Sequence, residues 1–134
     1  MVTRPLPVEL PDAREFWSGL RRGELLLQFC PRCRRYQHYP RSACTRCLGP
    51  ATWRPASGRG TVYSYSVVRQ NRMPPFDQLV PYVLAVVELD EGPRLLGNVT
   101  GCDVERVAVG LPVAFYADAI SDGVFLPFWR PSAP

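Results

Sequence analysis

Two pairs of closely spaced cysteines constrain this chain more than any other sequence feature. Cys30 and Cys33 form one Cys-x2-Cys pair, and Cys44 and Cys47 form a second pair ten residues later. The residues between the first and last of these cysteines are mostly Arg, Pro and Tyr, so they cannot build a core from aliphatic side chains. Two thiolate pairs at this spacing converge on one tetrahedral ion. We therefore predict a metal-stabilised, rubredoxin-like zinc ribbon.

The expected metal site is structural, because four thiolates leave no open position for water or substrate. Zinc is the leading interpretation. Iron is the alternative, since a tetrahedral four-sulfur site also suits redox iron, and it would make the chain a rubredoxin-like electron carrier. His38 follows Cys33 by five residues, but with four cysteines present it is not needed as a ligand.

The residues before the ribbon predict a short helix. Asp12 and Glu15 match a capping box, and Gly23 is suited to end the helix. A helix of this length is marginal in water by itself, so we expect it to dock on the ribbon or on a partner. Its apolar face consists of Phe16, Trp17 and Leu20.

Beyond Trp53 the pattern becomes that of β-structure. The sequence predicts five strands, at 61–68, 82–89, 94–100, 112–117 and 123–130. A three-stranded meander followed by a hairpin suits a small closed barrel of the OB type. The fold class is therefore mainly β, with an N-terminal helical segment (1–28), a zinc ribbon (29–52) and a five-stranded OB-fold barrel (53–134).

One connection in the expected barrel is unusually long. It runs from residue 70 to 81 and carries Met73, Pro75 and Phe76. A loop of this length in a small domain is often functional. An ordinary loop at the barrel rim is an equally good interpretation.

The supply of catalytic groups is poor. All 16 basic residues are arginine, and the chain has one histidine. Cys102 is the one cysteine outside the ribbon, and no histidine accompanies it in the sequence to activate it as a nucleophile. P-loop, G-x-S-x-G and G-x-G-x-x-G motifs are absent from the sequence. We expect a chain that is not an enzyme on its own.

Charge is concentrated in the N-terminal part. Residues 1–55 hold ten arginines and four acidic residues, a net charge of +6, and the remainder has a net charge of −2. Guanidinium groups bind phosphate and aromatic rings accept a flat base, which suits nucleic acid or a phosphorylated ligand such as coenzyme A. A solvated basic face is the plainer alternative, and the lack of a continuous basic run weakens the nucleic-acid interpretation. The candidate ligand-binding residues are Arg21, Arg22, Arg34, Arg35, Tyr36 and Tyr39.

These features occur in the order that is typical of one family. The residues in question are Phe16-Trp17-x-x-Leu20-x-x-Gly23-x-Leu25, both cysteine pairs, Trp53, Gly58-x-Gly60-Thr61-Val62-Tyr63-Ser64-Tyr65, Pro81 to Gly92, Leu96-Gly97-Asn98, Gly110-x-Pro112-Val113 and Pro127-Phe128-x-Arg130-Pro131. In these residues the chain resembles the zinc-ribbon and OB-fold proteins known as the domain of unknown function 35 (DUF35) family. Arg34 is a departure, because it stands where ribbon knuckles often carry glycine.

The resemblance implies a non-catalytic accessory subunit of a thiolase-like, acyl-CoA-processing enzyme, part of a hetero-oligomer that contains structural Zn²⁺. In such a complex, the charge and aromaticity of the residues suggest that the ribbon arginines lie near the phosphates of acyl-CoA, with Tyr36 or Tyr39 near the adenine. Phe16, Trp17 and Leu20 would contact the partner or the ribbon, and Met73, Pro75 and Phe76 would border the acyl entrance. A single-stranded nucleic-acid-binding protein is the alternative function.

The sequence also bears on location. No apolar run approaches the ~20 residues of a membrane span. The first seven residues show no apolar core of a secretion signal. We expect a cytoplasmic protein without membrane contact.

Overall fold

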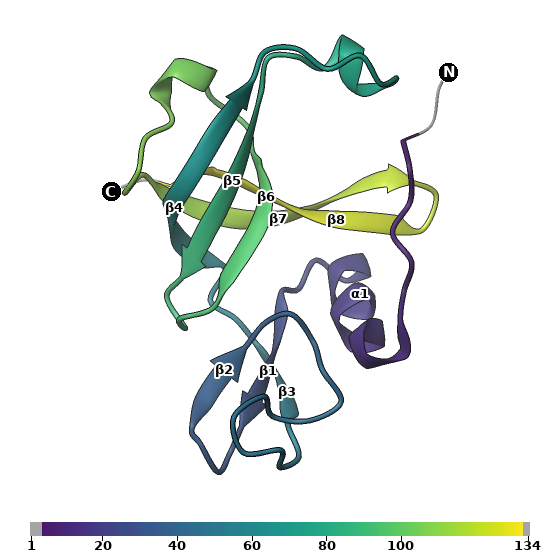
Figure 1. The fold of residues 1–134 in the computed structure, drawn as a ribbon, viewed down its shortest axis with the longest axis vertical. Coiled ribbons are helices and arrows are strands. Elements are labelled where there is room, and N and C mark those ends of the chain that lie inside the picture. Colours follow the sequence, from purple (N-terminus) through teal and green to yellow (C-terminus); the bar gives the residue numbers. More distant parts are fainter. Residues whose placement is uncertain (1–3, 133–134) are drawn as a thin grey trace.

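The chain passes from a helical N-terminal segment through a three-stranded sheet into a closed barrel (Figure 1). The computed structural model describes residues 4–132, and the outer ends of the expected segments 1–28 and 53–134 lie outside this range. The mainly β class predicted from the sequence is confirmed. The elements are η1 (Pro11–Ala13), α1 (Arg14–Arg21), β1 (Leu26–Cys30), β2 (Arg35–Gln37), β3 (Thr52–Pro55), β4 (Arg59–Val68), η2 (Phe76–Gln78), β5 (Tyr82–Leu89), β6 (Arg94–Val99), η3 (Val104–Arg106), β7 (Pro112–Ser121) and β8 (Val124–Pro131).

The two ends of α1 differ in how well the sequence predicts them. The prediction of a capping box is wrong, because Asp12 lies inside η1 and neither η1 nor α1 has a side-chain cap. The backbone itself makes the turn there, with the N–H of Ala13 donating to Leu10 O at 2.9 Å. The C-terminal end is as predicted. Gly23 has φ +78°, its N–H donates to Leu20 O and that of Glu24 donates to Gly19 O, a Schellman motif.

The ribbon is built on an antiparallel sheet in the order β2-β1-β3. Its central strand β1 pairs with β2 through Cys30↔Arg35 and with β3 through Leu26↔Pro55. The sheet therefore begins before residue 29 and extends past residue 52, the bounds expected for the ribbon. The division into domains at residues 28/29 and 52/53 remains a prediction.

The barrel has five strands in the closed order β4-β5-β6-β8-β7, which is the OB-type arrangement expected from the sequence. Its closing pair is parallel and short, with Asn98↔Phe128 and Val99↔Trp129 as the register of β6 with β8. Strand β7 is longer than expected and reaches Ser121, because pairing with β8 continues almost to the turn. The connection between β6 and β7 contains a single helical turn, η3.

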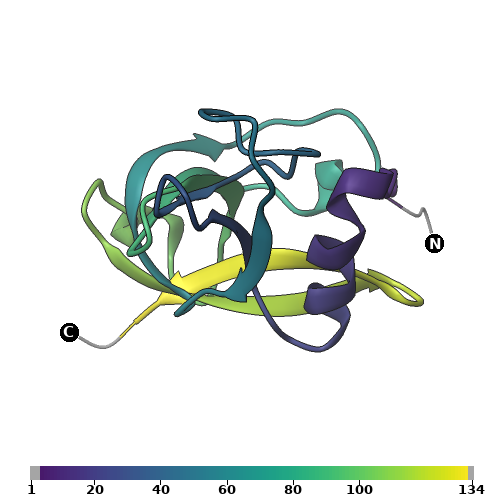
Figure 2. The ribbon, with the colours of Figure 1, turned by 90° about the horizontal axis from the view of Figure 1, so that it is seen from below.

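One hydrophobic core joins the ribbon side to the barrel. Helix α1 packs against both β1 and β8, and its buried side chains share a cluster with Leu27 of the ribbon and Trp129 of the barrel. Seen from below, the ribbon and α1 lie side by side across the same end of the barrel (Figure 2). The helix therefore stabilises the position of the metal-binding segment relative to the barrel.

Within residues 4–132, no helix combines the length and apolar character that crossing a membrane requires.

Candidate functional site

The four ribbon cysteines come together at one point. Their Sγ atoms all lie within 4.8 Å of one another, with Cys30 to Cys47 at 3.6 Å and Cys33 to Cys44 at 3.9 Å. A tetrahedron with Zn–S bonds of about 2.3 Å has S···S edges of about 3.8 Å. The donor set and its spacing therefore fit a tetrahedral metal ion, and the four sulfurs would hold it.

Each cysteine pair sits on a tight turn with a residue of left-handed backbone conformation at its end. Arg34 has φ +55° and Leu48 has φ +63°, each directly after the second cysteine of its pair. Their N–H groups donate to Cys30 O and Cys44 O at 2.7 and 2.9 Å. The two turns are therefore equivalent, and Arg34 adopts the conformation that glycine prefers.

Backbone N–H groups also point at the sulfurs. Cys33 N donates to Cys30 Sγ at 3.3 Å, Arg46 N to Cys44 Sγ at 3.4 Å, and Gly49 N to Cys47 Sγ at 3.3 Å. Hydrogen bonds from the backbone of Cys47 and Arg46 lower the pKa of Cys44 to about 6. Hydrogen bonding to Cys47 and then desolvation raise the pKa of Cys33 to about 12. A bound divalent cation would favour the thiolate form of both cysteines, because a thiol that coordinates such a cation is deprotonated.

A pair of glutamines holds the second half of the ribbon in place, which the sequence interpretation missed. The buried Gln28 donates to Arg41 O at 2.7 Å and accepts from Arg41 N at 2.9 Å. Gln37 donates to Gln28 Oε1 and accepts from Thr45 N, at 2.8 and 2.9 Å. The signal in the sequence was a single polar residue, Gln28, inside the otherwise apolar strand β1.

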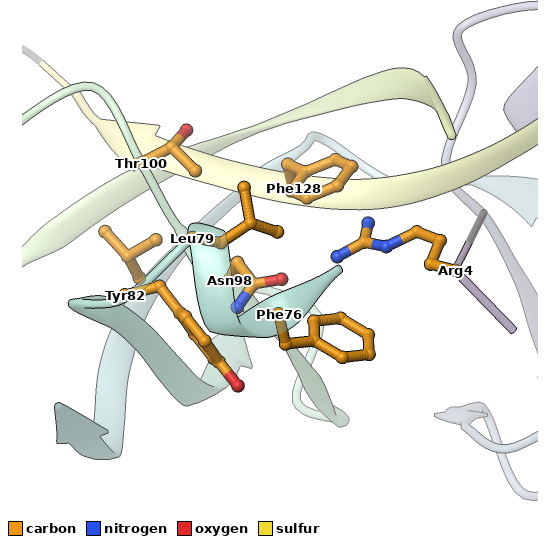
Figure 3. A pocket seen from close by; sticks show the side chains of 8 residues that line it. Arg4, Phe76, Leu79, Tyr82, Asn98, Thr100 and Phe128 are labelled. Carbon is orange, nitrogen blue, oxygen red and sulfur yellow. The ribbon is translucent and has the colours of Figure 1, made fainter. Parts of the chain in front are cut away.

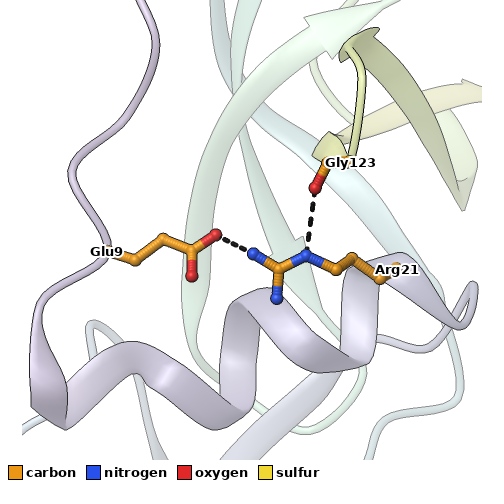
Figure 4. Close-up of polar contacts among 3 residues, drawn as sticks. All are labelled: Glu9, Arg21 and Gly123. Atoms are coloured by element: carbon orange, nitrogen blue, oxygen red, sulfur yellow. Dashed lines mark hydrogen bonds and ion pairs between the residues drawn. The ribbon is translucent and has the colours of Figure 1, made fainter.

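The helix arginines predicted to bind a ligand already have intramolecular partners. Arg21 forms an ion pair with Glu9, and its Nε donates to Gly123 O in the β7–β8 turn at 3.0 Å (Figure 4). Arg22 pairs with Glu24 at 3.3 Å. Arg21 thus connects the N-terminal segment, the helix and the barrel.

The ribbon residues predicted to bind a ligand lie elsewhere. Arg34 and Arg35 are exposed, and Tyr39 lies under the guanidinium of Arg41. Arg35 and Tyr36 line a cavity of about 350 Å³ between β2 and the β5–β6 turn. In Figure 1 that side of the ribbon is opposite the β7–β8 turn that Arg21 contacts. The structure therefore brings Arg35 and Tyr36 together but not with Arg21.

The apolar face of α1 is turned inward. Phe16, Trp17 and Leu20 have exposed fractions of 3%, 9% and 0%, and the ring of Phe16 lies 5.2 Å from that of His38. Of the two expected docking surfaces, the packing therefore fits the ribbon. The other expectation, that these side chains contact a partner, is corrected, because they are buried inside the chain itself.

The long β4–β5 connection contains η2 and borders a cavity of about 320 Å³ (Figure 3). Phe76 lines this cavity, whereas Met73 and Pro75 are not among its lining residues and Met73 is 57% exposed. The lining residues are Arg4, Phe76, Leu79, Tyr82, Asn98, Val99, Thr100 and Phe128.

Family models match most of the chain. Residues 17–52 match the model described as the rubredoxin-like zinc ribbon domain of ChsH2, and residues 53–118 match its C-terminal OB-fold domain.

Curated relatives are longer than this chain. A probable enoyl-CoA hydratase alpha subunit of Thermomonospora curvata is 34% identical over 98% of this chain and 41% of its own length. The 3-oxo-4,17-pregnadiene-20-carboxyl-CoA hydratase alpha subunit of Mycobacterium tuberculosis is 38% identical over 84% of this chain and 36% of its own length. A DUF35 domain-containing scaffold protein of Methanocaldococcus jannaschii is 35% identical over 64% of this chain and 52% of its own length. The chain thus spans about half or less of the length of these relatives.

Two solved structures share the fold. A chain of the Ltp2-ChsH2(DUF35) aldolase is 31% identical, with a TM-score of 0.86 over 95% of this chain and 99% of that one. A DUF35 protein of unknown function from Sulfolobus solfataricus has a TM-score of 0.64 over 91% and 86% of the two chains, and at 18% identity it supports the fold alone. With the ribbon, the barrel and their order all matched, the chain belongs to the ChsH2-type DUF35 family of zinc-ribbon and OB-fold proteins.

Proposed function

We propose that this chain is a non-catalytic accessory subunit of an acyl-CoA-processing enzyme complex, and that its partner is a thiolase-like protein. The observation that carries the proposal is the match over 99% of a chain in the Ltp2-ChsH2(DUF35) aldolase. The relatives named as scaffold proteins and as alpha subunits support the same role. The metal site agrees with it, because four thiolate ligands fill a tetrahedral ion and leave no position for substrate.

The test is reconstitution with a thiolase-like protein of the lipid-transfer type from the same source. The full zinc-loaded chain is co-expressed with it, and the mass of the purified complex is measured by size exclusion with light scattering. We expect a fixed stoichiometry and a higher activity or thermal stability of the partner than when it is purified alone. Recovery of a hydratase subunit in place of the thiolase-like protein in pull-downs would overturn the choice of partner.

We further propose that the complex contacts acyl-CoA through the exposed ribbon arginines. Arg34 and Arg35 are free to meet phosphate, and Tyr36 beside the second cavity offers a ring for the adenine. Arg21 and Arg22 have less support, because both are engaged by neighbouring acidic residues. Tyr39, half-covered by Arg41, is a second aromatic candidate.

Paired variants of the complex test this contact. Arg34→Ala/Arg35→Ala is expected to weaken acyl-CoA binding by about tenfold, the worth of one charged hydrogen bond. Arg21→Ala/Arg22→Ala is expected to have a smaller effect. The matched control is Arg72→Ala/Arg106→Ala, which removes two exposed arginines of the barrel side. Equal affinity in the ribbon variant and the control would show that the phosphates bind elsewhere.

The same proposal places the chain in the cytoplasm. A reducing compartment keeps the four thiols available for metal.

A further inference from the structure

The cavity beside the β4–β5 loop lies at the seam of the barrel. Asn98, Val99 and Thr100 reach it from β6 and its end, and Phe128 reaches it from β8, where the two strands pair over only two positions. Phe76 and Leu79 from the loop form the opposite wall (Figure 3). At about 320 Å³, with apolar walls and few polar groups, it falls within the size range of small-molecule sites.

Hydrogen bonds order the loop that forms one wall. Asn71 Nδ2 donates to the hydroxyl of Tyr82 at 3.0 Å, and Asn71 Oδ1 accepts from Met73 N at 2.9 Å. Within η2 the N–H of Leu79 donates to Phe76 O at 3.0 Å. The Glu9–Arg21 ion pair holds the N-terminal segment that forms another wall (Figure 4). The cavity is thus preformed, which lowers the entropic cost of filling it.

The polar groups of the cavity are few and distinct. The guanidinium of Arg4 lies 5.1 Å from the ring centre of Phe76, and it joins none of the ion pairs among residues 4–132. Asn98 Nδ2 donates to Val83 O at 2.9 Å, so the amide is anchored with its Oδ1 turned toward the space in front of Arg4 (Figure 3). The hydroxyl of Thr100 is engaged by Tyr116 and Trp129 O.

We propose that this cavity binds an amphipathic carboxylate, a small aliphatic acid whose anionic end pairs with Arg4. An unpaired cation at the mouth of an apolar space selects a ligand with one negative end and one apolar end. The chain of the acid packs between Phe76, Leu79 and Phe128, and Asn98 Oδ1 accepts a hydrogen bond from a hydroxyl or amide that such an acid carries. This inference does not rest on the accessory role, since the cavity lies within a single chain.

The probe is octanoate, titrated at pH 7 into the full zinc-loaded chain and followed by backbone amide signals in NMR spectra. We expect saturable shifts at residues 76–79, 98–100 and 128. The uncharged analogue 1-octanol is expected to bind about tenfold more weakly, because it lacks the charged partner for Arg4. Shifts that are absent, or that map outside the cavity, overturn the proposal.

Variants at the half-buried Arg4 and at the exposed Arg72 and Leu79 separate the charge effect from loss of folding. Arg4→Gln is expected to weaken octanoate about tenfold while leaving 1-octanol unchanged, and the loop variant Arg72→Gln is expected to bind as the original chain does. Leu79 is 50% exposed, so Leu79→Asp is tolerated and is expected to repel octanoate more than its neutral counterpart Leu79→Asn does. Equal loss in Arg4→Gln and Arg72→Gln would show non-specific attraction and overturn the site.

Discussion

Left-handed backbone at non-glycine residues marks both turns of the metal site. Arg34 and Leu48 occupy equivalent places after the second cysteine of each pair, with φ +55° and +63°. For residues other than glycine this conformation costs about 1–2 kcal/mol. The turns keep it because their N–H groups must reach Cys30 O and Cys44 O.

Leu48→Gly is therefore expected to stabilise the chain. Leu48 is 80% exposed, so little packing is lost, and relief of the strained φ contributes about 0.5–1 kcal/mol after the greater freedom of glycine in the unfolded chain is subtracted. Urea unfolding of the zinc-loaded protein measures this change in the free energy of unfolding. The control Val109→Gly, at a 69% exposed residue without positive φ, is expected to destabilise. A Leu48→Gly variant less stable than the parent would contradict the strain argument.

Gln28→Leu tests the buried glutamine pair. The substitution keeps the size of the side chain but leaves the N–H and carbonyl of Arg41 without their partner, at a cost of about 1–3 kcal/mol. Faster zinc transfer to a chromophoric chelator is expected as well, because the loop that carries Cys44 is loosened. Gln78→Leu, at an exposed position, should change stability by less than about 0.5 kcal/mol. Similar behaviour of the two variants would rule out this role for Gln28.

At the scale of elements, α1 is stabilised by packing and not by its own length. It has eight residues, and its buried side chains are shared with β1 and β8. Gly19 lies where the helix approaches the start of β1. A Cβ atom there would meet Leu26 Cγ at 2.8 Å and Glu24 O at 3.1 Å.

Gly19→Ala is expected to destabilise the protein, although alanine is the better helix former. The propensity gain is about 1 kcal/mol, and the clash with Leu26 and the backbone of Glu24 costs about 1–3 kcal/mol. Thermal unfolding of the zinc-loaded chain shows whether the variant is less or more stable than the parent. Ser18→Ala, one residue earlier in the same helix, has no such clash to overcome and should be neutral or slightly stabilising. A stabilised Gly19→Ala would mean that α1 can move away from β1.

The contact between α1 and the ribbon depends on pH through His38. Burial, and then the charge of Arg41, lower the pKa of His38 to about 4 from its usual 6.5. The unfolded chain therefore binds more protons between those values, so stability is complete above pH 6.5 and falls as the pH drops toward 4. The loss is on the order of 3 kcal/mol.

His38→Phe keeps a ring against Phe16 but removes this titration. Its stability is expected to fall less than that of the parent between pH 6.5 and 5.5, measured by urea unfolding with zinc bound. Because both proteins contain the same four cysteines, acid loss of metal affects them equally. Parallel curves for parent and variant would exclude His38 as the source of the pH dependence.

At the scale of the whole molecule, the ribbon and barrel share one core. Trp17 from α1 and Trp129 from β8 are both buried in it. Loss of the metal-held ribbon therefore removes one side of the barrel's own packing. Stability of the two parts is expected to be cooperative.

Removal of the metal is expected to lower the melting temperature of the entire chain. Binding of structural zinc contributes about 10 kcal/mol or more to folded zinc-finger peptides, and here part of that free energy reaches the barrel through the shared core. Far-UV circular dichroism for the barrel and tryptophan fluorescence for the core should change in a single transition after chelation. Two separate transitions would contradict the shared core. Elemental analysis of the same sample distinguishes zinc from the iron alternative.

Local spacing was sufficient to predict the metal cluster and the barrel. The Cys-x2-Cys pairs identify Cys30, Cys33, Cys44 and Cys47 because two short turns can present four sulfurs to one ion. The continuous apolar run at 82–89, bounded by turn signals, predicts a buried strand because a strand in the middle of a sheet can bury both of its faces. Gly23 marks the end of α1 through its backbone freedom.

Contacts between distant residues were decided by the tertiary structure alone. Whether Phe16, Trp17 and Leu20 face a partner or the chain's own core depends on what the fold packs against them, and periodicity states only that they share a face. The pairing of Arg21 with Gly123, 102 residues away, likewise has no local signal. The cavity between Arg4 and Phe128 arises because barrel closure pairs β6 with β8 and the N-terminal segment passes beside their seam, a result of long-range packing that no sequence window contains.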